Sequence, residues 1–171
     1  MKLVDLATIE NVREYFLEKG YPQFTVELGG ERFKYFEVSQ SEEPRLPKFA
    51  TMLTTGKEQD GYLAGVADTV DKKFQPYWMF HEFYEAFRTQ NLEITEQCPT
   101  SLKRELILVP KEIKKDYILQ RREFFEKLVP YAINNNYPQR EIYGFGKSYD
   151  HLDRIVRKLG LEQKQLSQMQ E

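Results

Sequence analysis

The segment FTVELGGERFKYFEV, residues 24–38, decides the fold class of this chain. Apolar and polar residues alternate in both halves, which is typical of β-strands with one buried face. Gly29 and Gly30 separate the halves, and a two-residue glycine turn is a strong signal for a β-hairpin. A second pair of strand-like segments, residues 49–55 and 61–68, flanks a longer polar turn. We therefore expect an antiparallel sheet of about four strands, made of two hairpins.

Helical patterns surround this sheet and make the expected fold class α+β. Gly20 follows the first helical pattern and Pro110 separates two later ones, as helix boundaries often show. The expected helices cover residues 6–19, 76–89, 100–109, 111–131 and 149–159. The length of 171 residues suits a single domain. In that domain we expect residues 1–75 to hold a helix and the sheet, 76–160 to be helical, and 161–171 to be a frayed tail.

Composition narrows the function classes. Charged residues make up 30% of the chain and nearly balance, with a formal net charge of −2. This balance predicts a well-solvated surface and argues against a nucleic-acid partner. No apolar run reaches the length of a membrane span, and the N-terminus lacks a signal-peptide pattern. We expect a cytoplasmic protein of bacterial type without a membrane partner.

The single cysteine, Cys98, excludes an intramolecular disulfide and any zinc site that needs several cysteines. No histidine lies near it in the sequence to activate a thiolate nucleophile. We expect Cys98 to be a small, buried apolar side chain.

Chemistry is expected in the segment PYWMFHEFYEAF, residues 76–87. Pro76 suits the first turn of a helix, where its missing N–H would have no helical partner. At about 100° per residue, an apolar stripe forms from Met79, Phe80, Phe83, Ala86 and Phe87. His81 and Glu85 lie four residues apart on nearly the opposite face, so their side chains are neighbours.

The order His81-Glu82-x-x-Glu85 resembles the His-Glu-x-x-His active-site helix of zincin-type metallopeptidases, with glutamate in place of the second histidine. The resemblance implies that His81 and Glu85 bind a metal ion and that Glu82 is the general base for a metal-bound water. Zinc, manganese and iron all accept such ligands. It also implies a zincin-like fold in which an edge strand, residues 61–68, holds a peptide or protein substrate. The implied function is a metal-dependent hydrolase, a small zincin-like peptidase.

A third metal ligand is needed, and the sequence leaves the choice open. Glu105 lies beside an apolar helical stripe and is the first candidate, because a buried carboxylate needs a partner. His151 and Asp153 are the alternatives. Arg121 projects from the apolar face of another helix, so an ion pair of Arg121 with Glu105 or Glu85 is a rival interpretation.

The alternative function is a non-enzymatic interaction or regulatory protein. The chain contains 11 tyrosines, which favour interfaces as well as cores. In this interpretation His81 and Glu85 form an ordinary charged helix face. The fragment GFGKS, residues 144–148, lacks the spacing and flanking elements of a phosphate-binding loop and is expected to be a turn.

Overall fold

The computed structural model describes residues 9–43, 52–55 and 63–160 of the chain. The chain divides into two compact units, with the boundary between Asn91 and Leu92. We call them the sheet unit and the helical unit. Helices and strands are both present, so the predicted α+β class is confirmed. The prediction of a single domain over residues 1–171 stays a prediction.

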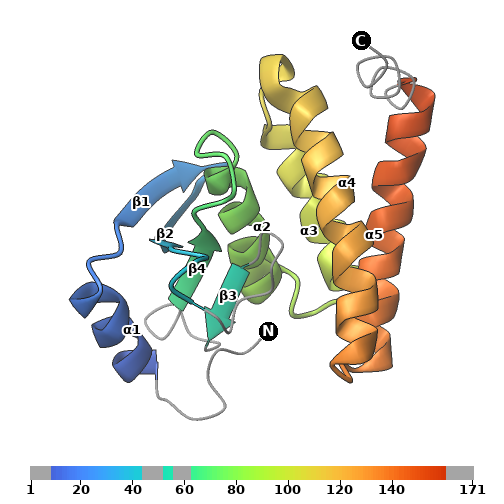
Figure 1. Ribbon diagram of the computed structural model, residues 1–171. Coiled ribbons are helices and arrows are strands. Elements are labelled where there is room, and N and C mark those ends of the chain that lie inside the picture. The colour runs from blue at the N-terminus through green and yellow to red at the C-terminus, as the bar shows by residue number, and fades with distance from the viewer. Residues whose placement is uncertain (1–8, 44–51, 56–62, 161–171) are drawn as a thin grey trace. The chain divides into compact units, whose positions relative to one another are not determined.

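The described part of the sheet unit contains two helices and four strands (Figure 1). Their bounds in chain order are α1 Ile9–Glu18, β1 Gln23–Leu28, β2 Glu31–Val38, β3 Met52–Thr55, β4 Leu63–Ala67 and α2 Gln75–Arg88. Gly29 and Gly30 connect β1 to β2 with φ angles of 62° and 83°. Positive φ at both positions is the geometry of a type I′ turn, which glycine adopts without strain. The first predicted hairpin is therefore present.

The sheet is mixed, which corrects the prediction of a purely antiparallel sheet. Its strand order is β1-β2-β4-β3. Both predicted hairpins pair antiparallel, but β4 lies between β2 and β3 and runs parallel to β2. Among the described strands, β1 and β3 are consequently the edges. The expectation that residues 61–68 form a substrate-holding edge strand is wrong, because β4 has a hydrogen-bonded neighbour on each side.

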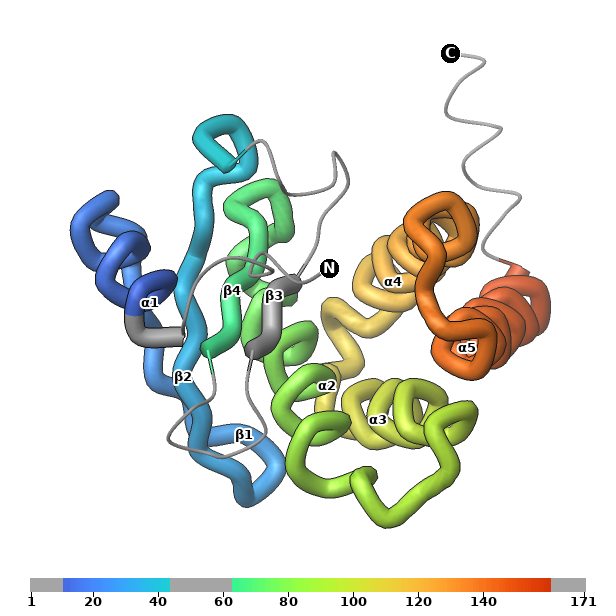
Figure 2. The backbone as a smooth tube through the Cα atoms, turned by 90° about the horizontal axis from the view of Figure 1, so that it is seen from below, coloured from blue at the N-terminus to red at the C-terminus, as the bar shows by residue number. Residues whose placement is uncertain are grey.

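The two helices of the sheet unit cover opposite faces of the sheet, as Figure 2 shows. Phe36 of β2 packs edge-on against Phe16 of α1, with ring centroids 5.3 Å apart. Phe33 of the same strand stacks on Phe83 of α2 at 5.4 Å. Because successive strand side chains alternate between faces, these contacts place α1 on one face and α2 on the other.

Gly65 of β4 allows the sheet to pack closely on the α1 side. A Cβ atom at this position would lie 3.0 Å from Val38 Cγ2 and 3.7 Å from Phe16 Cε2. A glycine inside a strand often marks such a close approach.

The described part of the helical unit consists of α3 Ile94–Leu108, α4 Lys111–Asn134 and α5 Gln139–Lys158. Two of these helices begin earlier than predicted. Pro99 lies inside α3 rather than before it. The GFGKS fragment lies inside α5, so the turn predicted there is wrong. It is no phosphate loop either, because a helix cannot wrap its backbone around a phosphate.

Packing between α3 and α5 explains why the chain is helical both at Pro99 and in the GFGKS fragment. A proline at position 99 cannot donate the helical hydrogen bond to the carbonyl of Thr95. Gly144 of α5 approaches α3 at this same carbonyl, since an added Cβ would lie 3.4 Å from Thr95 O. Close packing thus compensates the weak helix propensity of both residues.

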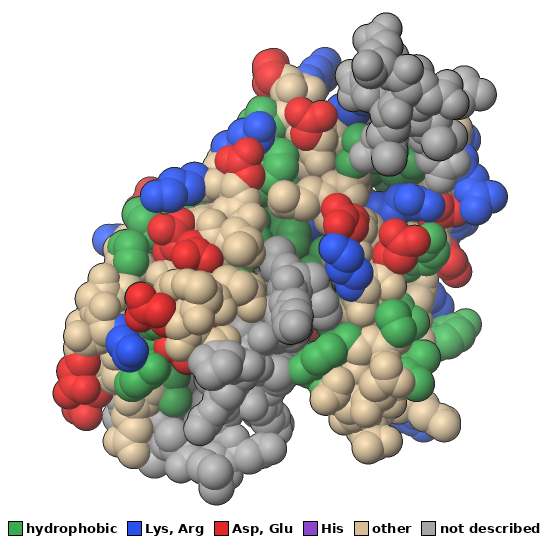
Figure 3. All heavy atoms as spheres, viewed as in Figure 1, with side chains coloured by type: hydrophobic (Ala, Val, Ile, Leu, Met, Phe, Trp, Pro, Cys, Tyr) green, Lys and Arg blue, Asp and Glu red, His purple; other side chains and the backbone are tan. Residues whose placement is uncertain are grey.

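Among the described helices, none combines the length and the apolar character needed to cross a bilayer. On the face shown in Figure 3, acidic and basic side chains are interspersed, as the nearly balanced composition predicts.

Candidate metal centre on α2

Helix α2 is anchored to the sheet by its aromatic side. Pro76 lies at the start of the helix, as predicted. Phe83 stacks on Phe33, and Phe80 lies 6.3 Å from the same ring. His81 and Glu85 are displaced by about 200° from Phe83 around the helix axis, so they lie on its other side.

His81 and Glu85 form a close pair, as their spacing predicts. His81 Nε2 lies 3.1 Å from Glu85 Oε2. His81 is only 1% exposed, and the side chain of Glu85 is 29% exposed. Two ligand atoms on one ion, each about 2.0–2.2 Å from it, lie roughly 3–3.5 Å apart. The pair therefore fits two adjacent positions around a divalent ion, and it is also a good hydrogen bond.

Glu82 is half-buried. Helical geometry turns its side chain about 100° away from that of His81. Its predicted role as general base stays a prediction.

Glu105 is held in a buried polar cluster of the helical unit. Its Oε1 lies 2.8 Å from Arg121 Nε, and Arg121 Nη2 donates to Oε2 at 3.1 Å. The hydroxyl of Tyr117 donates to Oε1 as well. All three side chains are inaccessible to solvent. Both carboxylate oxygens are thus engaged, which favours the ion-pair interpretation of Glu105, while its role as a metal ligand stays a prediction.

The Arg121 guanidinium is further stabilised by aromatic rings. Its Cζ lies 5.1 Å from the ring centroid of Phe124 and 5.0 Å from that of Phe125. Burial disfavours the charged form, yet Glu105 and Tyr117 hold the pKa of Arg121 above its ordinary value. The Arg121 guanidinium therefore stays protonated at physiological pH.

The two alternative third ligands also lie in the helical unit. Asp153 accepts a hydrogen bond from Arg122 Nε at 2.9 Å, and its Oδ2 lies 2.7 Å from Arg157 Nε. The carboxylate of Asp153 is therefore shared by two arginines. His151 is half-buried, and burial together with the nearby Lys103 lowers the pKa of its imidazole.

The thiol of Cys98 is buried, as predicted from the sequence. Its Sγ lies 3.3 Å from Ser148 Oγ, and the Ser148 hydroxyl donates to the carbonyl of Gly144. Within the helical unit Cys98 is therefore part of the packing between α3 and α5.

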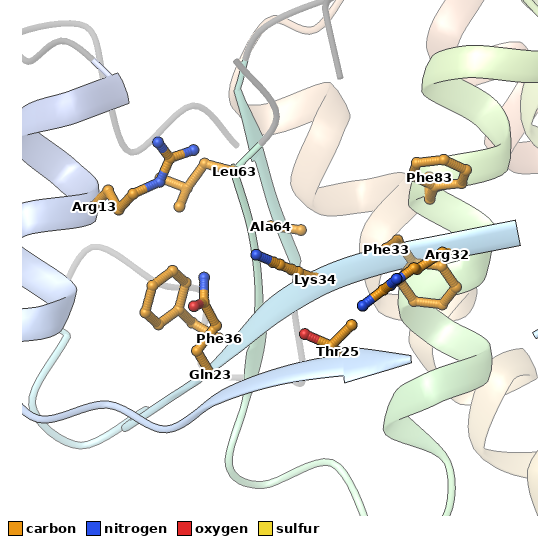
Figure 4. A pocket seen from close by; sticks show the side chains of 10 residues that line it. All are labelled: Arg13, Gln23, Thr25, Arg32, Phe33, Lys34, Phe36, Leu63, Ala64 and Phe83. Carbon is orange, nitrogen blue, oxygen red and sulfur yellow. The ribbon is translucent and has the colours of Figure 1, made fainter. Parts of the chain in front are cut away.

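A cationic groove of about 450 Å³ lies on the sheet unit (Figure 4). Arg13 projects into it from α1, and Arg32 and Lys34 project from β2. Thr25 adds a hydroxyl, and no carboxylate belongs to the described lining. This groove was not predicted from the sequence. The available signal was the alternation of exposed cations with buried aromatics along β2.

The cationic groove is separate from the His81–Glu85 pair. Its only α2 residue is Phe83, which lies on the helix face that packs on the sheet. It is therefore not a substrate cleft for a metal centre on the other side of α2.

No family model matches the sequence, and comparisons with curated proteins and with solved structures found no match either.

Proposed function

We propose that the protein is a metal-dependent hydrolase in which His81 and Glu85 of α2 bind a divalent metal ion. The observation that carries the proposal is the 3.1 Å separation of His81 Nε2 and Glu85 Oε2 at a histidine that is 1% exposed. A solvated helix face would leave that imidazole in water. A nitrogen and a carboxylate oxygen suit zinc, manganese or iron.

The residues of α2 have distinct roles in this proposal. His81 carries its proton on Nδ1 and offers the lone pair of Nε2, while Glu85 offers a negatively charged oxygen. Glu82, half-buried on the same turn, removes a proton from the attacking water. The bound ion would supply Lewis-acid polarisation of the substrate carbonyl. The water oxygen bonds to the carbonyl carbon, the carbon–nitrogen bond breaks, and Glu82 returns the proton to the leaving amine.

The peptide class of substrate rests on the resemblance of the His81-Glu82-x-x-Glu85 segment to zincin-type enzymes. One part of the resemblance does not hold: β4 lies inside the sheet and is not an edge strand that could hold a substrate. A third ligand completes the site, and Glu105, His151 and Asp153 remain its candidates.

The test is hydrolysis of a mixed library of fluorogenic peptides by the metal-loaded full chain. Glu82→Gln should lower the rate by about a hundredfold or more while the metal content stays unchanged. Glu14→Gln, the same substitution at an exposed position of α1, is the matched control and should leave the rate unchanged. Equal activity of the Glu82→Gln variant and the wild type would contradict the assigned base.

A second candidate is a non-enzymatic interaction or regulatory protein, and the cationic groove of the sheet unit favours it. Arg13, Arg32 and Lys34 line the groove, and although Arg32 Nε lies 3.8 Å from Glu27 Oε1, no carboxylate belongs to the described lining, so the groove attracts an acidic ligand. Binding of a fluorescent poly-glutamate peptide tests this candidate. Lys34→Glu should weaken binding by about tenfold, whereas Lys19→Glu, outside the groove, should not. An equal effect of both variants would indicate only a general charge effect.

A further inference from the structure

The helical unit carries an open groove of about 600 Å³, and neither His81 nor Glu85 belongs to its described lining. All three helices contribute to it. On α4 the lining residues Lys111, Lys114, Lys115 and Ile118 follow the spacing i, i+3, i+4, i+7, so they share one helix face. His151 and Ile155 of α5 and Leu159, directly after its end, repeat every four residues along the lining. The groove thus joins regular helix faces.

The groove has an apolar surface that remains exposed. Ile107 of α3 is 68% exposed, and Leu159 at the end of α5 is 57% exposed. Ile118 and Leu106, which also line the groove, are buried beneath them. Large aliphatic side chains that gather in one groove, rather than being scattered singly, indicate a binding surface.

The rim of the groove is strongly basic. Four lysines line it, at positions 103, 111, 114 and 115, and no carboxylate belongs to the described lining. Within the described residues none of these lysines takes part in an ion pair. The lowered pKa of His151, caused by burial and then by Lys103 and Arg154, is consistent with a positive potential in the groove.

We propose that this groove docks an acidic amphipathic helix of a partner protein. Apolar side chains at helical spacing on the partner would cover Ile107, Ile155 and Leu159, and its carboxylates would pair with the lysines on the rim. Charge complementarity selects an acidic partner, because the groove offers cations alone. The open shape selects a helix over a fatty acid, since an acyl chain here would stay half in water.

The binding test uses the full chain and a designed fluorescent peptide of about four helical turns, with leucines on one face and glutamates on the other. We expect saturable binding that weakens as salt is added. A peptide with lysine in place of every glutamate should bind at least about tenfold more weakly. Equal binding of the two peptides would overturn the proposal, as would binding of oleate without binding of the acidic peptide.

Matched variants locate the site. Lys115→Glu should weaken binding by about tenfold, whereas Lys127→Glu, the same change elsewhere on α4, should have little effect. Ile107→Ser should weaken binding, and the control Ile133→Ser alters an aliphatic residue that is 54% exposed outside the groove. These positions are exposed, so the variants should fold. Equal effects within either matched pair would overturn the proposed location.

NMR adds a local readout, because the chain has only two histidines. Saturation with the acidic peptide should shift the His151 imidazole signals, which His151→Gln identifies, and should leave those of His81 unchanged. Absence of peptide binding to the full chain would overturn the proposal.

Discussion

Glu105 and Arg121 form an ion pair of 2.8 Å whose side chains are both completely inaccessible to solvent. Tyr117 donates its hydroxyl to the same carboxylate. Removing two charges from water is costly, and only close contacts inside the protein offset that cost. The pair joins α3 to α4 and fixes how these helices of the helical unit pack.

Breaking this pair should strongly destabilise the chain. Arg121→Met leaves the Glu105 carboxylate buried without its cation, and we expect the free energy of unfolding to fall by about 3–5 kcal/mol. Chemical denaturation followed by circular dichroism measures the change. Arg88→Met is the control: its ion pair with Glu31 is partly exposed and should contribute no more than about 1 kcal/mol. Similar losses in the two variants would contradict the assigned role of the buried pair.

Replacing two glycines of α5 with larger residues should change the free energy of unfolding in opposite directions. Gly146 has open space where a Cβ would lie, so Gly146→Ala should raise the free energy of unfolding by about 0.5–1 kcal/mol. Gly144 faces the backbone of Thr95, and Gly144→Leu should lower it by about 1–3 kcal/mol. Thermal and chemical unfolding check both signs. Stabilisation by Gly144→Leu would show that α3 and α5 do not pack as closely as described.

His151 should make the helical unit less stable in acid. Its pKa is lowered in the folded chain by burial, Lys103 and Arg154. As pH falls below about 6.5, the unfolded chain takes up this proton more readily than the folded chain, so the free energy of unfolding decreases. Below the pKa that His151 has in the folded chain, the stability contributed by its neutral imidazole is fully lost. His151→Gln should therefore flatten the dependence of stability on pH in this range.

NMR titration of the His151 imidazole measures the same effect directly. The pKa should be below that of an unperturbed histidine and should rise in Lys103→Gln, because a neighbouring positive charge is removed. A His151 pKa at or above about 6.5 in the wild type would contradict the account.

Local signals in the sequence predicted the elements whose boundaries depend on a few residues. The positive φ angles of Gly29 and Gly30 realise the predicted hairpin turn. Pro76 and the aromatic stripe predicted α2, and the spacing of four residues predicted that His81 and Glu85 meet. In each case the physical cause lies within a few residues along the chain.

Features that depend on tertiary packing were missed. Pro99 and Gly144 indicate breaks when considered alone, but the contact between α3 and α5 keeps both segments helical. The parallel pairing of β2 with β4 brings together strands that are not neighbours in the sequence, and no short-range pattern encodes it. The sequence left open whether Glu105 binds a metal ion or pairs with Arg121. Tertiary packing decides which cation lies beside the buried carboxylate.

Elemental mass spectrometry of the purified, untagged protein measures whether His81 and Glu85 bind a metal ion. We expect near-stoichiometric zinc, manganese or iron in the wild type, loss of the metal in His81→Ala, and retention in the control Glu14→Gln at an exposed position of α1. The absence of metal from the wild type, even after incubation with excess zinc or manganese, would contradict the claim and leave His81 and Glu85 as a hydrogen-bonded pair.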